Sequence, residues 1–145
     1  MGSFVYRFSN PIVPAAKATI TARLSSEFIG NGGGPGNGYS DVTLHLNGRT
    51  YETQRVMPDN DKGRTYTWEV NGADLNTDNH LVFSVEEVSD YRNGIVIYPS
   101  SDYPKGTDEP IMVHVYADGE GVPIPIHIPY SSKGNVDWGE TGWNL

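Results

Sequence analysis

The residues best suited to ligand chemistry lie near the C-terminus, in residues 134–145, which read GNVDWGETGWNL. Trp138 and Trp143 stand among glycine, acidic and polar residues rather than apolar ones. Indole faces pack on the apolar C–H faces of sugar rings, and the carboxylates of Asp137 and Glu140 can accept hydrogen bonds from sugar hydroxyls. The tail therefore predicts a carbohydrate site. Two other interpretations stay open, because the rings could instead cover an open end of the fold or anchor a subunit interface.

A second polar cluster, Asp90, Tyr91 and Asn93, belongs to the run SDYRN. Tyrosine combined with Asp and Asn is typical of adaptable polar recognition surfaces. The same residue types are also common in ordinary polar loops. We expect this cluster to contact the same ligand as the tail.

The run PDNDKG places oxygen-bearing side chains at Asp59, Asn60 and Asp61, followed by the turn residue Gly63. This resembles the start of a calcium-binding loop, but the distal bidentate Glu and the flanking helices of an EF-hand are missing. A calcium ion would therefore need ligands from several loops together. The alternative is an ordinary turn, because Asp and Asn favour turns by bonding their own backbone.

Three histidines, His45, His114 and His127, alternate with apolar residues, which places them on the polar faces of their expected strands. If the three strands were neighbours, the imidazoles could converge on a zinc or copper ion. Otherwise they are solvent-facing strand residues. A fourth, His80, is expected in a turn beside Asn79.

No catalytic centre is expected. No serine has the flanking residues of a nucleophile elbow. Glu86 and Glu87 are adjacent in an expected strand, so their side chains point to opposite faces and cannot act as a carboxylate pair. The chain has no cysteine, which excludes a disulfide framework and thiolate metal sites.

These candidate residues must be positioned by β-strands, because apolar and polar residues alternate with a period of two along most of the chain. Strands are expected at 4–8, 17–24, 41–46, 50–54, 65–70, 81–85, 95–98, 111–116 and 123–128. One apolar and one polar face per strand is typical of two packed sheets. We therefore predict one domain over residues 1–145: an all-β antiparallel two-sheet β-sandwich, jelly-roll or immunoglobulin-like, of about eight or nine strands.

Three Asn-Gly pairs punctuate the strands, and Asn-Gly is the strongest short signal for a two-residue hairpin turn. Asn47–Gly48 and Asn93–Gly94 are predicted to form hairpins. Asn71–Gly72 is followed by a turn-rich stretch, so we expect it to open a longer loop.

Two segments interrupt the alternation. Residues 30–38 read GNGGGPGNG, which predicts a flexible loop at one end of the sandwich, and no Gly-Lys-Ser/Thr phosphate loop follows them. Residues 121–129 carry Pro123 and Pro125 at alternate positions. Proline cannot donate to a strand ladder, so we expect an edge strand that resists further pairing.

The formal net charge of −8 disfavours nucleic acid and anionic membrane surfaces as partners. No apolar run approaches the ~20 residues of a membrane-spanning helix, so membrane insertion is not expected. Residues 1–22 show no visible signal peptide. The compartment stays open, although a lectin would be expected outside the cell or on its surface.

Together these features favour a non-catalytic carbohydrate-binding protein, a lectin or a carbohydrate-binding module, with calcium as an optional cofactor. A homo-oligomer would raise its avidity. The alternative is a structural or assembly protein, such as a virion, appendage or toxin-complex component, that uses residues 134–145 for subunit contacts. A small hydrolase or a hydrolase inhibitor is a weaker third choice.

Overall fold

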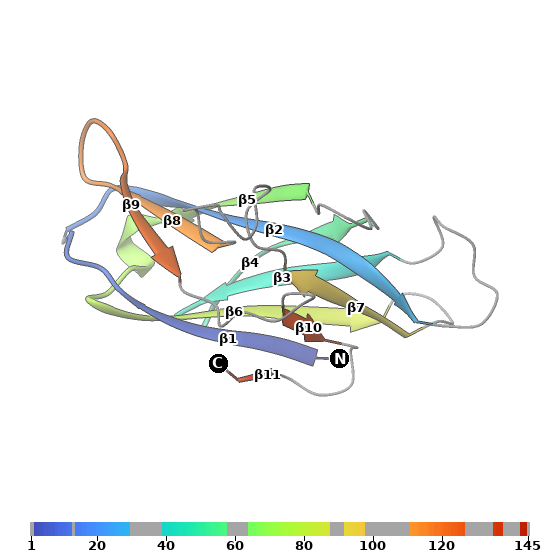
Figure 1. The fold of residues 1–145 in the computed structure, drawn as a ribbon. Coiled ribbons are helices and arrows are strands. Elements are labelled where there is room, and N and C mark those ends of the chain that lie inside the picture. Colours follow the sequence, from blue (N-terminus) through green and yellow to red (C-terminus); the bar gives the residue numbers. More distant parts are fainter. Residues whose placement is uncertain are drawn as a thin grey trace.

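The computed structural model describes residues 2–12, 14–29, 39–57, 64–87, 92–97, 111–126, 135–137 and 143–144. These residues form two β-sheets packed face to face (Figure 1). The strands are β1 (Gly2–Ser9), β2 (Lys17–Ile29), β3 (Ser40–Leu46), β4 (Arg49–Val56), β5 (Arg64–Asn71), β6 (Asp78–Glu87), β7 (Arg92–Ile97), β8 (Ile111–Tyr116), β9 (Val122–Ile126), β10 (Asn135–Asp137) and β11 (Trp143–Asn144). A single 3-10 turn, η1 (Gly72–Asp74), lies between β5 and β6.

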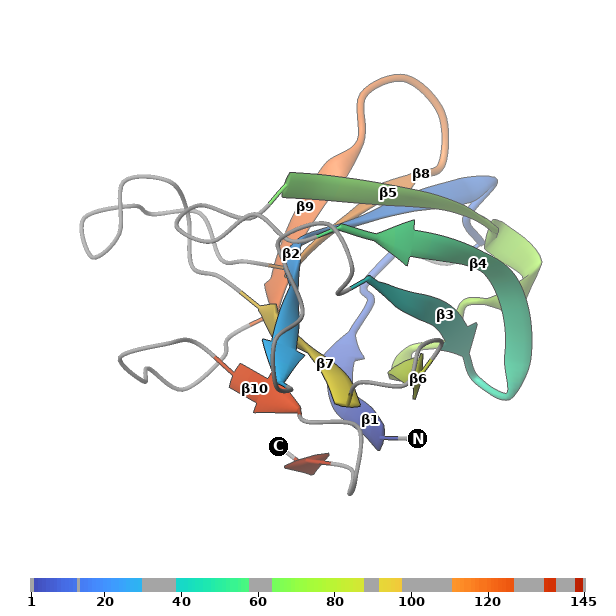
Figure 2. The ribbon, with the colours of Figure 1, turned by 90° about the vertical axis from the view of Figure 1, so that its right-hand side faces the viewer.

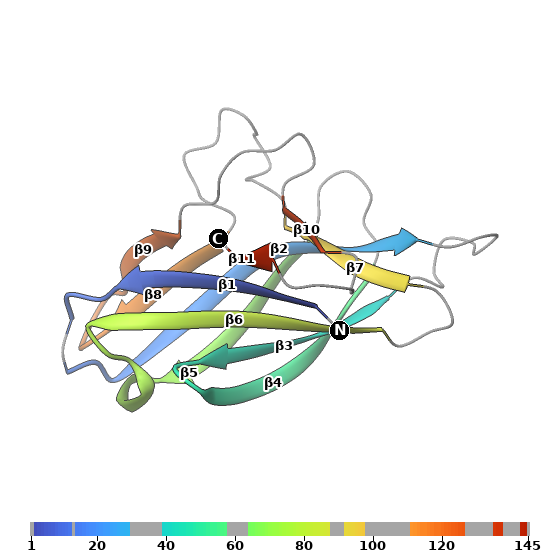
Figure 3. The ribbon, with the colours of Figure 1, turned by 90° about the horizontal axis from the view of Figure 1, so that it is seen from below.

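The first sheet has the strand order β11-β1-β6-β3-β4, and Figure 3 shows it in front. The second has the order β10-β7-β2-β8-β9, with β5 also paired to β2. Among the described pairings all are antiparallel except that between β1 and β11. The predicted all-β two-sheet sandwich is confirmed, without a choice between the two predicted topologies.

The core lies between the sheets, because strands such as β3 and β8 alternate buried with partly exposed residues and turn their apolar positions inward. Trp68 of β5 and Phe83 of β6 meet there with ring centroids 5.4 Å apart, and Tyr6 of β1 packs edge-on to Phe83. Phe4, Phe83 and Trp68 are fully buried. Burial of such large rings is the main source of stability in a fold of this size.

Two of the Asn-Gly predictions are confirmed. Asn47 and Gly48 have φ of 51° and 82°, as a type I′ turn requires, and they join β3 to β4. Asn71–Gly72 ends β5 and opens the longer connection through η1. At Gly72 an added Cβ would lie 2.0 Å from the carbonyl oxygen of Ala15, so only glycine fits there.

The prediction of a hairpin turn at Asn93–Gly94 is wrong. Both residues lie inside β7, where Asn93 is opposite Phe28 and Gly94 is opposite Glu27 of β2. The β-branched residues that follow continue this pairing. The strand therefore begins before the pair, at Arg92.

Strand β2 is central to the second sheet, because it pairs with three strands. One edge of β2 pairs with β5, and the other pairs with β8 and then with β7. Leu24 is opposite both Arg64 of β5 and Ile97 of β7, so β5 and β7 lie on different edges of β2. Ala22 is opposite Ile111 of β8, on the same edge as β7. In turn β9 pairs with β8, and β10 pairs with β7.

Strand β9 lies at the edge of its sheet, as predicted from its prolines. Pro123 is opposite His114 and Pro125 is opposite Met112. Because proline has no N–H, the ladder donors of β9 belong to the alternate residues, such as Ile124. The backbone nitrogens of the two prolines therefore point away from β8, and the free edge of β9 has no N–H donor at either proline.

Candidate ligand-binding end of the sandwich

The C-terminal half of β2 brings together the points where several predicted site segments attach. The Ser26 amide donates to the carbonyl oxygen of Met57 over 3.1 Å. Ser26 is opposite Ile95 of β7, and Ile95 is opposite Asp137 of β10. Neighbouring strands are about 4.8 Å apart, so this row sets Met57 and Asp137 about 14 Å from each other. We call the end of the sandwich that contains residues 24–29 of β2 the candidate end.

A second row lies two residues away along β2. Arg64, Leu24, Ile97 and Asn135 follow one another across four strands. Met57 and Arg64 flank residues 58–63, so both attachment points of that segment lie at the candidate end. Asp59, Asn60 and Asp61 themselves lie outside the described residues.

The second polar cluster attaches at the same end. Strand β7 begins at Arg92, which is opposite Ile29, the last residue of β2. For Asn93 the structure describes the backbone, opposite Phe28. Asp90 and Tyr91 lie outside the described residues, immediately before this strand.

The tail takes part in both sheets through backbone pairing. Strand β10 pairs with β7, whereas Trp143 and Asn144 of β11 pair in parallel with Phe4 and Val5 of β1. The backbone of Trp143 therefore lies beside a fully buried core position. Trp138 and Glu140 lie outside the described residues. The tail is thus an integral part of the sandwich as well as the carrier of the predicted site.

Three buried serines form hydrogen bonds at the candidate end. Ser25, Ser26 and Ser40 are at most 2% exposed. The Ser26 and Ser40 hydroxyls are 3.2 Å apart and join β2 to β3, and the Ser25 hydroxyl donates to the Ser26 carbonyl oxygen. Sequence reasoning missed this role, although two consecutive serines where β2 should continue its alternation are a visible signal.

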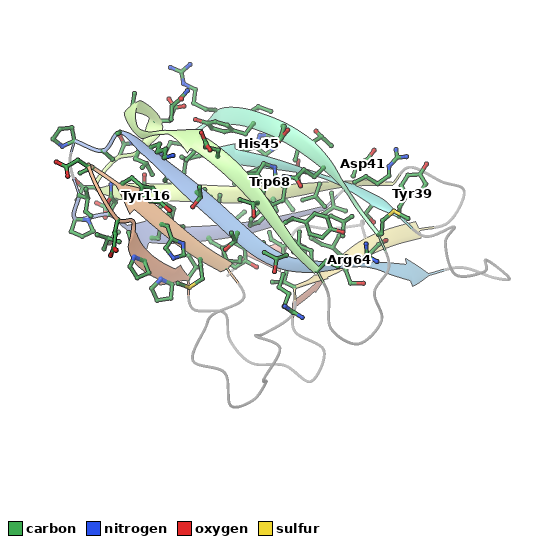
Figure 4. The ribbon with its side chains drawn as sticks, turned by 90° about the horizontal axis from the view of Figure 1, so that it is seen from above. Tyr39, Asp41, His45, Arg64, Trp68 and Tyr116 are labelled. Atoms are coloured by element: carbon green, nitrogen blue, oxygen red, sulfur yellow. The ribbon has the colours of Figure 1, made fainter. Side chains whose placement is uncertain are left out.

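One charged cluster is fully described near this end (Figure 4). Arg55 of β4 donates from Nε and Nη2 to the two carboxylate oxygens of Asp41 at 3.0 and 3.2 Å. Its guanidinium carbon lies 3.8 Å from the ring centroid of Tyr39, the first described residue after the 30–38 segment. The hydrogen bond to Asp41 raises the pKa of Arg55. The cluster needs the β3–β4 register to be recognised, so the sequence alone did not indicate it.

The condition for a shared metal site, that the histidine strands are neighbours, is not met for His45 and His114. His45 lies on β3 and His114 on β8, which belong to different sheets, and both alternate with inward-facing residues. His45 instead bonds neighbouring hydroxyls, with Nδ1 3.1 Å from Thr50 and Nε2 2.9 Å from Ser84. His127 lies outside the described residues, and His80 lies in β6 rather than in a turn.

No group of three metal-ligating side chains occurs among the residues whose positions are described. The described part of the chain also has no helix with the length and apolar character needed to cross a membrane. Comparison with protein-family models, with curated proteins and with solved structures found no match to this chain.

Proposed function

We propose that this protein is a non-catalytic carbohydrate-binding protein, a lectin or a carbohydrate-binding module, whose ligand binds at the candidate end. The observation that supports this is the row from Met57 through Ser26 and Ile95 to Asp137. It brings the attachment points of the acidic segment and of the tryptophan-bearing tail to one end of one sheet. Segments far apart in the sequence can thereby contribute to one site.

The residue types of these segments suit a sugar ligand. Trp138 and Trp143 would stack on the C–H faces of sugar rings. The carboxylates of Asp137 and Glu140 would accept hydrogen bonds from hydroxyl groups, and the cluster Asp90, Tyr91 and Asn93 would add further polar contacts from the start of β7. A chain with a net charge of −8 favours neutral over anionic glycans.

Calcium would act through Asp59, Asn60 and Asp61, because hard cations prefer carboxylate and amide oxygens. In that role the ion would bridge the protein to vicinal sugar hydroxyls. A glycan array with and without chelator tests sugar binding and calcium dependence together.

The array should compare the unaltered protein with a Trp138→Ala/Trp143→Ala variant and with Asp118→Asn. Asp118 is exposed in the β8–β9 turn at the opposite end, which makes its variant a matched control. We expect specific glycan binding that the double variant loses and the control keeps. Binding that survives the double substitution would remove the tryptophans from the site.

Absence of glycan binding would instead favour the alternative function, a structural or assembly protein. Light scattering on the full chain and on a chain lacking residues 134–145 then decides. A defined large oligomer that dissociates on deletion supports subunit contacts through the tail.

A further inference from the structure

Strands β4 and β5 follow each other in sequence and run side by side (Figure 2), yet they belong to different sheets. β4 pairs with β3, and β5 pairs with β2. Within the described residues no backbone ladder joins β4 to β5. Each therefore presents a strand edge toward the other, and unpaired strand edges are templates for pairing with another chain.

Two side chains of β5 bond the backbone of β4 and its continuation. The Trp68 indole Nε1–H donates to the carbonyl oxygen of Glu52 at 2.9 Å. The Tyr66 hydroxyl accepts from the Met57 amide at 3.1 Å. One carbonyl and one amide on this edge are thus satisfied by side chains rather than by a strand.

Two side chains of β4 do the same for β5. The Gln54 Nε2–H donates to the carbonyl oxygen of Thr67 at 2.7 Å, and the Tyr51 hydroxyl accepts from the Asn71 amide at 3.1 Å. The Tyr51 hydroxyl donates its own proton to Asp74. We call the four side chains that bond across this edge the clasp: Tyr51, Gln54, Tyr66 and Trp68.

We propose that the clasp closes the β4 and β5 edges against strand addition by a second copy of this chain. The bonding is reciprocal, because each strand supplies one donor and one acceptor side chain to the backbone of the other. The edge strand β9 is treated differently, because it carries outward prolines. The clasp also fixes Met57, which precedes residues 58–63, but the proposal does not depend on carbohydrate binding.

The test uses the variant Tyr51→Phe/Gln54→Met/Tyr66→Phe, which removes three polar groups with little change in side-chain volume. Trp68 is kept because its ring is fully buried in the core. Amide hydrogen exchange at Met57 and Asn71 should accelerate by about tenfold, as expected for the loss of one net hydrogen bond each. Sedimentation velocity over a concentration series should show self-association beyond that of the unaltered protein.

The matched control is Thr43→Val/Thr53→Val. These hydroxyls are 2.6 Å apart and join β3 to β4, two strands that are already paired through their backbones. We expect this control to sediment like the unaltered protein.

A folded clasp variant that also sediments like the unaltered protein at every concentration overturns the proposal. Unchanged exchange at Met57 and Asn71 would overturn it as well. Should the triple variant fail to fold, Gln54→Met and Tyr66→Phe are measured singly, and unchanged exchange and association in both would reject the clasp.

Discussion

At the scale of residues, asparagine side chains hold together the end of the sandwich opposite the candidate end. Asn47 Nδ2 donates to the carbonyl oxygen of Asp74 at 2.7 Å and to Asn79 Oδ1 at 2.8 Å, while its Oδ1 accepts from the His80 amide. The β3–β4 turn is thereby bonded to the start of β6. Asn47 serves both as a turn residue that tolerates positive φ and as a bridge between two connections.

Asn79 and Asn10 extend this network inside the protein, where both are 1% exposed. Asn79 Oδ1 accepts from the Asn76 amide, and its Nδ2 donates to the Asn76 carbonyl oxygen. Asn10 makes the equivalent pair of bonds with Ile12. Buried amides with satisfied donors and acceptors rigidify a loop, whereas unsatisfied ones would destabilise it.

Substitution of Asn47 separates the bonding role from the backbone role. Asn47→Gly keeps the positive φ but loses three hydrogen bonds, so we expect the free energy of unfolding to fall by about 2 kcal/mol. Asn47→Ala should cost about 1 kcal/mol more, because a Cβ is strained in the left-handed region. Urea unfolding of both variants measures the difference. A neutral Asn47→Gly would show that the side-chain bonds contribute nothing net.

The Tyr51 hydroxyl should give stability a specific pH dependence. Burial, followed by the hydrogen bond to Asp74, raises its pKa above the ordinary value of 10.0. The folded protein therefore holds this proton more tightly than the unfolded chain, and the stabilisation is present below about pH 10 and lost as the pH rises through the raised pKa. The stability difference between the unaltered protein and Tyr51→Phe should be constant from about pH 7 to 9 and narrow above pH 10. A difference that widens above pH 10 would contradict this.

At the scale of elements, β9 shows how a short sequence pattern becomes a property of a sheet. Its two prolines remove N–H donors from the free edge of the strand, while Ile124 between them continues the ladder with β8. The same alternation could not have revealed the clasp, because Tyr51, Gln54, Tyr66 and Trp68 act across strands of different sheets.

Restoring the donors of β9 should create a pairing edge. Pro123→Val/Pro125→Val adds two outward N–H groups to an exposed strand, so we expect concentration-dependent association by size-exclusion chromatography with light scattering. Ile124→Val is the control, since its N–H already faces β8. Equal elution of the double variant and the control would show that the prolines do not protect this edge.

At the scale of the whole molecule, the tail links the two sheets, with β10 in one and β11 in the other. Deletion of residues 134–145 removes both pairings and uncovers the edges of β7 and β1. We expect a lower urea midpoint for the shortened chain. An unchanged midpoint would mean that the tail only decorates a sandwich that is stable without it.

Features that depend on neighbouring residues could be predicted from the amino-acid order. The period of two specified the buried side of strands such as β3 and β8, Asn47–Gly48 specified a hairpin, and the prolines specified an edge, because backbone geometry imposes these patterns locally. The same local logic was wrong at Asn93–Gly94, where pairing with β2 continues the strand through a turn-forming pair.

Which strands are neighbours could not be predicted in this way and is seen only in the folded molecule. Strand order depends on packing between residues far apart in the chain, and it leaves no periodic trace in the sequence. For that reason His45 and His114, which share the same sequence pattern, lie in different sheets. Met57 and Asp137 are eighty positions apart in the sequence, yet they lie in one row across the strands. The sequence contains the residue types of the proposed sugar site, and long-range pairing places the attachment points of residues 58–63 and of β10 at one end.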